Sequence, residues 1–297
     1  AQYIVSPSTK LDWKVFGTIA ERNSIGFMRP INQEDDLGNR QVDRDYYTTY
    51  GSELRMTSEH QLFGISNTLA AGIRYYNGRI DRKQNGVGDS GSEMNFELIP
   101  GQEFPRDLDF RNVNYAAFAE NAFRFSEKFL MTAGLRVESI RSENQGQFGV
   151  SNGDPLILDP LSRTRSFVLA GFGAEYHVTS TSEFYSNWSQ AYRPVLISDL
   201  TPPATTDVID SDLQDSRGYN FDLGYRGNIG TVFHFDVSYF YLNYADRIGT
   251  IAQLNAEGQP FQFRTNLGQS ISQGVEAYLE FDPITAFFKS SRFGYLH

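Results

Sequence analysis

Hydrophobic and polar residues alternate with a period of two along most of this chain. From 219 to 226, aromatic and aliphatic residues occupy the odd positions, while polar residues or glycine occupy the even ones. A similar alternation runs through 129–138, 231–242 and 273–281. Successive side chains of a β-strand point to opposite faces, so the pattern predicts strands with one apolar and one polar face. Helical periodicity is hard to find, and the predicted fold class is all-β.

The alternating segments are long for a soluble protein. We expect strands near 11–22, 45–57, 61–77, 112–124, 129–142, 164–176, 183–193, 216–226, 231–249 and 262–282, with partial strands at 1–6 and 288–297. Strands of soluble proteins centre on about five or six residues. A tilted strand needs about nine to eleven residues to cross the hydrocarbon layer of a membrane. The lengths therefore favour strands that cross a membrane.

Short and long connections alternate strictly. Short turns are predicted at 7–10, 58–60, 126–128, 179–181 and 227–230, and long polar loops at 23–44, 78–111, 143–163, 194–215 and 250–261. Bacterial outer-membrane barrels combine short periplasmic turns with long extracellular loops. We therefore predict an antiparallel transmembrane β-barrel, with the aromatic residues near strand ends forming interfacial girdles. The alternative, a soluble solenoid or propeller, would show a repeat of fixed period, which is not found.

Composition narrows the function further. The 297 residues include no cysteine and carry a formal net charge of -10, with a pI near 4.9. Disulfides and thiolate chemistry are therefore excluded, and a nucleic-acid partner is disfavoured because no basic stripe neutralises phosphates. No run of 18 or more apolar residues provides a transmembrane helix. The mean hydropathy of -0.43 fits a soluble protein and a barrel equally well.

Several segments carry a family resemblance. The relevant stretches are 114–121 (NYAAFAEN), 132–138 (TAGLRVE), 187–194 (NWSQAYRP), and 266–268 (NLG) with 274–276 (GVE). In this order they resemble the barrel strands of TonB-dependent outer-membrane receptors. The segments 22–27, 40–47 and 189–200 are most similar to ferric citrate receptors within that family.

The resemblance implies uptake of a ferric chelate, either ferric citrate or another ferric siderophore, across the outer membrane of a Gram-negative bacterium. Its implied partners are the TonB-ExbB-ExbD complex, reached through an N-terminal plug domain, and outer-membrane lipid. Residues 1–297 would form part of the barrel, about half of a 22-stranded wall. No plug segment is recognised, and 294–297 stop inside a strand, so we expect a fragment lacking the plug and the C-terminal strands.

Two other function classes stay open at this stage. One is a passive outer-membrane porin, which would need no plug, and the other is a soluble β-rich binding protein. An enzyme is not expected, because no nucleophile elbow, P-loop or HExxH motif occurs. Ser238 and His234 share a strand face about 13 Å apart, too far for a hydrogen bond. No catalytic residue, resident metal or cofactor is predicted.

Loop arginines are the candidate ligand contacts. The guanidinium group is a planar fork that binds carboxylates in a bidentate manner, which suits an anionic ferric chelate. The candidates are Arg193, Arg29, Arg79, Arg106 and Arg111. Arg193 comes first because it ends a strand inside the family-like motif, although a structural salt bridge is the more common role for such a residue.

Two further residue sets are given structural roles. The acidic run of Asp207, Asp210, Asp212 and Asp215 lacks the order of a tight calcium loop and is expected to be a solvated loop. His60 and His177 are placed in periplasmic turns and His234 toward the lumen, so haem ligation from an extracellular loop is not expected.

Overall fold

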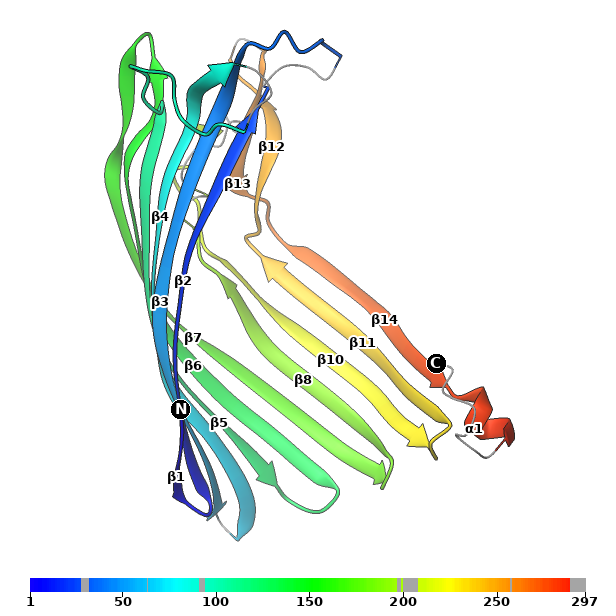
Figure 1. Ribbon diagram of the computed structural model, residues 1–297. Helices are drawn as coiled ribbons and strands as arrows, with labels where there is room; N and C mark the ends of the chain where they lie inside the picture. The colour runs from blue at the N-terminus through cyan, green and yellow to red at the C-terminus, as the bar shows by residue number, and fades with distance from the viewer. Residues whose placement is uncertain are drawn as a thin grey trace.

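The protein is one wide, curved antiparallel sheet with a small second sheet beside it. The computed structural model describes residues 1–27, 32–62, 64–90, 94–196, 199, 208–256 and 258–288. Eleven strands follow one another in the order β1-β2-β3-β4-β5-β6-β7-β8-β10-β11-β14. Figure 1 shows them as a trough, with β1 and β14 at its two edges. The antiparallel β fold and the partial barrel wall are as predicted.

Strand bounds extend well beyond the predicted ones. The large sheet contains β1 (Gln2–Ser6), β2 (Thr9–Gly26), β3 (Asn39–Leu62), β4 (Ile65–Ser90), β5 (Arg106–Arg124), β6 (Phe129–Ser151), β7 (Asp154–Thr179), β8 (Ser182–Arg193), β10 (Ser216–Ile229), β11 (Phe233–Ala245) and β14 (Ser270–Phe281). The longest, β4 and β7, have 26 residues each. At about 3.3 Å per residue they rise far above a hydrocarbon layer about 30 Å thick.

Short turns gather at one end of the sheet and long excursions at the other (Figure 1). The predicted alternation of short and long connections is therefore observed except between β6 and β7, and two of the short turns were misplaced. Residues 58–60 lie inside β3, paired with 67–69 of β4, and the chain reverses after Leu62. The turn expected at 227–230 follows β10 instead, since Ile229 still pairs with Phe233.

The segment 143–163 is a hairpin and not the loop that we expected. Strands β6 and β7 stay paired up to Ser151 and Asp154, with only Asn152 and Gly153 between them. Both turn residues have positive φ, 53° and 89°. An Asn-Gly pair is a strong signal for such a two-residue turn, so the sequence contained the information.

The upper excursions also contain regular structure. Ala245 ends β11, and the chain forms a hairpin of β12 (Ile248–Leu254) and β13 (Pro260–Asn266) before it rejoins the large sheet at β14. The single strands expected at 231–249 and 262–282 are each interrupted by this hairpin. Strand β9 (Val208–Ile209), from the β8–β10 excursion, pairs with β13 in parallel. Two long excursions are thereby joined into one small sheet.

The described chain ends in a short helix. This helix, α1 (Pro283–Phe288), follows β14, with the Asp282 carboxylate accepting hydrogen bonds from the amides of Ile284 and Thr285. Of the partial strand expected at 288–297, the structure describes Phe288 alone, and 289–297 lie outside the described residues. Among the described residues, no helix is long and apolar enough to span a membrane.

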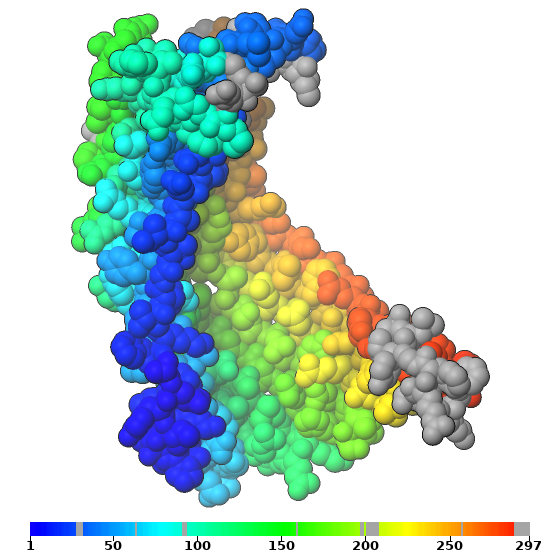
Figure 2. All heavy atoms as spheres, viewed as in Figure 1, coloured from blue at the N-terminus to red at the C-terminus, as the bar shows by residue number. Residues whose placement is uncertain are grey.

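The two faces of the sheet differ in chemistry. One face carries large, solvent-exposed apolar side chains, among them Trp13, Val15, Ile73, Leu135, Val168, Phe172 and Val275. The other face carries ion pairs and arginine–aromatic contacts, such as Arg136 with Glu138 and over Phe118. Leu196, from the excursion between β8 and β10, lies against this polar face. Figures 1 and 2 show the upper excursions on the side toward which the sheet curves, so the polar face is the concave one.

Few side chains are fully buried, because the wall is one layer thick. The largest buried cluster is Leu108 with Phe110, packed against Ile80, Phe148 and Leu158 in the upper part of β4–β7. This cluster stiffens the wall above the apolar band, where the candidate site lies.

Candidate functional site

A concave pocket of about 260 Å³ opens on the upper inner wall. Tyr47 and Thr49 of β3, Tyr76 and Arg82 of β4, and Phe110 of β5 contribute to its lining. Strand alternation and register place these side chains on one face of three neighbouring strands. The guanidinium of Arg82 lies 5.5 Å from the centre of the Phe110 ring. The pocket thus combines aromatic surface with a cationic group.

A buried carboxylate organises the arginines beside this pocket. The side chain of Asp45 has no exposed surface. Its Oδ2 atom lies 2.5 Å from Arg22 Nη2, and its Oδ1 atom lies 3.4 Å from Arg82 Nε. The hydroxyl of Tyr47 and the amide of Gln84 donate to the same carboxylate at 3.3 and 3.4 Å. A buried charge requires such compensation, and Asp45 in turn fixes the positions of both arginines. Arg22 stays 59% exposed and so remains accessible to a ligand.

Arg106 joins this cluster at the start of β5. It is only 9% exposed and lies opposite Gln84 of β4. Burial lowers the pKa of its guanidinium from the ordinary value, and the nearby positive charge of Arg82 lowers it further, while Asp45 and Asp43 act in the opposite direction. Arg22, Arg82 and Arg106 are thereby gathered around the carboxylate of Asp45, with Asp43 close by.

Arg193 holds the excursion that follows its own strand. Its Nη2 atom lies 3.0 Å from Asp199 Oδ2, and the amide of Leu196 donates to the same oxygen at 2.9 Å. Arg264 of β13 approaches the other oxygen of Asp199 at 3.7 Å. Arg193, the first candidate for a ligand contact, therefore forms a structural salt bridge, which was the alternative role considered for it.

A second anchor, around Arg165 of β7, was missed by the sequence. Its Nε lies 2.9 Å from Asp215 Oδ1, and its Nη2 donates to the carbonyl of Val195 at 2.6 Å. Asp215 also accepts hydrogen bonds from Tyr192 at 2.5 Å and from the Val195 amide at 2.7 Å. Within the acidic run, Asp212 is exposed as expected, but Asp215 is a partly buried anchor, and Asp207 lies outside the described residues.

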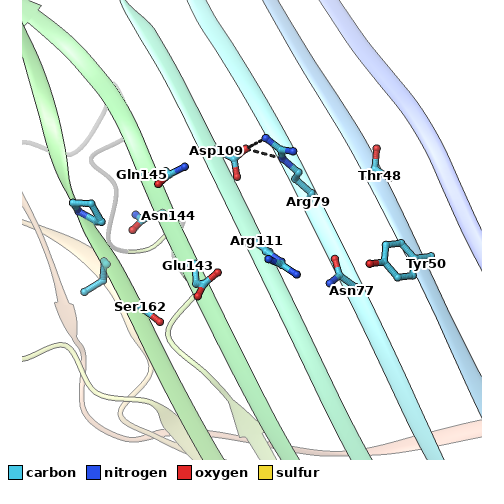
Figure 3. A pocket seen from close by; sticks show the side chains of 12 residues that line it. Thr48, Tyr50, Asn77, Arg79, Asp109, Arg111, Glu143, Asn144, Gln145 and Ser162 are labelled. Carbon is cyan, nitrogen blue, oxygen red and sulfur yellow. Dashed lines mark hydrogen bonds and ion pairs between the residues drawn. The ribbon is translucent and has the colours of Figure 1, made fainter.

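The other candidate arginines lie elsewhere. Arg79 and Arg111 are register partners whose side chains strand alternation directs to the convex face, although both residues also border the concave pocket. Figure 3 shows the two side chains on the same side of the sheet as Tyr50. Arg79 forms an ion pair with Asp109. Arg29 falls outside the described residues. Of the four candidates that the structure describes, Arg106 is the one that joins the cluster around Asp45. Its neighbours Arg22 and Arg82 were not chosen because spacing alone does not show which loop arginines share a face.

One histidine and two glutamates lie close together at the lower, inner wall. The ligand atoms of Glu175, His177 and Glu183 all lie within 4.8 Å of one another, a spacing that could hold a metal ion. Arg226 already lies 2.5 Å from Glu183, and His177 Nδ1 is 2.9 Å from the same carboxylate. Ion pairing therefore accounts for this group. His177 lies in β7 and His60 in β3, so neither occupies a turn as we expected.

Comparison with known proteins identifies the family. Residues 5–296 match the family model described as TonB dependent receptor-like, beta-barrel. The chain therefore belongs to the β-barrel family of TonB-dependent receptors, as the motifs indicated. A search of curated proteins gave no match.

Solved structures share the fold. The unliganded ferric citrate transporter FecA superposes with a TM-score of 0.70 at 14% identity, over 97% of this chain and 39% of that one. The copper transporter OprC gives 0.71 at 15%, over 93% and 42%. The ferric yersiniabactin uptake receptor FyuA from Yersinia pestis gives 0.66 at 15%, over 99% and 39%. This chain thus spans less than half the length of these proteins.

Proposed function

We propose that this chain is barrel wall of an outer-membrane receptor that imports an anionic ferric chelate with energy from the TonB-ExbB-ExbD complex. Ferric citrate is the first choice of ligand and another ferric siderophore the second. The coupling contact would be made by a plug domain, whose presence remains a prediction from the family resemblance. The proposed role is selection and transport, with no bond-making chemistry.

The cluster of Arg22, Arg82 and Arg106 around Asp45 carries this proposal. An anionic chelate that enters the trough from above meets cations already oriented by a buried carboxylate, so less side-chain entropy is lost on binding. The aromatic rings of the neighbouring pocket provide apolar contact area. Proteins with similar structures include a ferric citrate transporter, a ferric yersiniabactin uptake receptor and a siderophore receptor, which supports the choice of an iron chelate.

Uptake of radiolabelled iron tests this proposal. Iron-starved cells that carry the receptor would be given ferric citrate or a ferric hydroxamate, with and without a protonophore. We expect uptake from citrate that collapses when the protonophore is added. Uptake from the hydroxamate alone would reject the ligand, and uptake indifferent to the protonophore would point to a passive porin.

Single arginine variants locate the ligand on the wall. We expect Arg82→Gln and Arg106→Gln each to weaken chelate binding by about tenfold, since a charge-assisted contact contributes about 1.5–3 kcal/mol. Arg141→Gln is the matched control, because it removes the same charge from the convex face and Arg141 does not line the pocket. Equal losses in all three variants would show that the concave pocket is not the site.

A further inference from the structure

A second hollow of the wall lies on the convex face. A shallow cavity of about 650 Å³ is lined by side chains of β3 to β7, including Thr48, Tyr50, Asn77, Arg79 and Arg111. Figure 3 shows these side chains on the near side of the ribbon, with the hydroxyl of Tyr50 and the guanidinium of Arg111 both directed toward Asn77. The transport proposal gives this cavity no role, because it faces away from the trough.

The height of the cavity relative to the membrane can be estimated from a row of tyrosines at its lower rim. Tyr50, Tyr75 and Tyr115 form a contiguous row on the convex face, with ring centres 6.2 and 5.2 Å apart. Such rows lie at the boundary between hydrocarbon and headgroups. Arg111 is four residues above Tyr115 on β5, which is about 10 Å along the membrane normal for a tilted strand. The headgroup layer of a bilayer is about 5–8 Å thick on each side. The long side chain of Arg111 can reach down into this layer.

Two arginines and two carboxylates line the cavity, but the carboxylate opposite Arg111 is paired elsewhere. Arg79 pairs with Asp109, and Glu143, which is the register partner of Arg111, pairs with Arg141 at 2.6 Å. Arg111 forms no ion pair or hydrogen bond with any residue that the structure describes. An anion bound beside Arg111 would supply the missing partner.

We propose that this cavity binds the phosphate of an outer-leaflet lipid headgroup. Arg111 would pair with the phosphate oxygens, and the Tyr50 and Thr48 hydroxyls would donate to them from the next strand. The lipid's acyl chains would then run down the apolar band, past side chains such as Ile73 and Val137, which are 60% and 49% exposed. The inference rests on the proposed membrane location and is independent of which ligand the receptor imports.

Native mass spectrometry of the detergent-purified receptor tests this site. The probes are bis-phosphorylated lipid A, the same lipid without its phosphates, and inorganic phosphate. We expect the wild type to retain the phosphorylated lipid, and Arg111→Gln to retain at least fivefold less. Arg217 of β10 shares strand parity with the exposed Leu223, so Arg217→Gln removes an equal charge from the convex face outside the cavity and should change retention by less than twofold.

Three results would overturn the proposal. The first is an equal loss of retention in Arg111→Gln and Arg217→Gln. The second is equal retention of phosphorylated and dephosphorylated lipid by the wild type. The third is an effect of Arg111→Gln on inorganic phosphate alone. Tyr50→Phe removes one hydroxyl and no charge, and it should lower retention about twofold even if Arg111→Gln fails to fold. Iron uptake that fails in every variant, with lipid retention intact, would reject the transport proposal and leave this one standing.

Discussion

The concave and convex faces of the upper wall use the same residue type in different ways. On the concave face, Arg22 and Arg82 converge on the buried carboxylate of Asp45. On the convex face, Arg79 pairs with Asp109, while its register partner Arg111 has no ion pair with a described residue. Arg79 and Arg82 are three residues apart on one strand and so point to opposite faces. Whether an arginine occupies an odd or an even position of its strand therefore decides which groups it can bind, more than whether it lies near a loop.

The largest effect is expected when a charge is placed on the convex face, which we assign to lipid contact. Leu135 lies on the convex apolar band and is 58% exposed, whereas its neighbour Arg136 faces inward and pairs with Glu138. Leu135→Arg should cost about 2–4 kcal/mol, as for arginine near the midplane of a membrane barrel. The measurement is the free energy of folding into lipid vesicles from urea. Leu135→Ala is the control, since it adds no charge, and a similar cost for both changes would refute the lipid assignment.

The next test removes the centre of the concave cluster. Asp45→Asn keeps the shape but leaves two or three guanidinium groups without their shared charge, so local stability should fall by about 2–3 kcal/mol. Because Arg22 is 59% exposed, solvent screening keeps the loss below that of a fully buried pair. Hydrogen exchange of amides at 41–47 and 82–86 measures it. Asp81→Asn is the matched control, because it removes the same charge from the opposite face of the neighbouring strand β4. Unchanged protection in Asp45→Asn would mean that the cluster is not organised by this carboxylate.

A smaller effect is expected lower on the concave face, at Gly224. A Cβ atom there would meet the ring of Tyr185, whose hydroxyl donates to Asp236 at 2.8 Å. Gly224→Val should therefore displace the ring and destabilise the wall by about 1–2 kcal/mol. Thermal unfolding would show it. Gly149→Val serves as the control because a Cβ there meets only Leu156 at ordinary contact distance. Equal shifts in melting temperature would mean that the Tyr185 ring moves aside at no cost.

The smallest predicted effect is a pH dependence of the upper sheet. Hydrogen bonds from the Thr265 hydroxyl and the Asp212 amide lower the pKa of Asp210 below its ordinary value of 3.8. A lowered folded-state pKa means that the stabilisation is present above the ordinary value and disappears as the pH falls through the folded one. Exchange of amides at 208–210 should thus rise slightly below about pH 4. Asp210→Asn should show no such rise, and a rise that persists in this variant would assign the effect to another group.

Much of the fold could be predicted because alternation is a local property. The two faces, the order of strands and the separation of short turns from long excursions all follow from residues close in sequence. Misplacements had local causes as well. The Asn152–Gly153 turn was hidden inside a polar segment interpreted as a loop, and the end of β3 at Leu62 was obscured by the polar residues 58–60. Polar composition marks strands that rise above the membrane as readily as it marks loops.

The candidate site was much less predictable, because it depends on residues that are distant in sequence. The sequence by itself determined an antiparallel wall with an apolar outer and a polar inner face, since period-two alternation fixes where each side chain points. Only the tertiary structure decided that Arg22, Arg82 and Arg106 gather at Asp45, that Arg193 holds its own excursion through Asp199, and that Arg111 faces outward without a partner among the described residues. The physical reason is register: pairing between strands sets which charges meet across the wall, and one residue of shift would exchange every face.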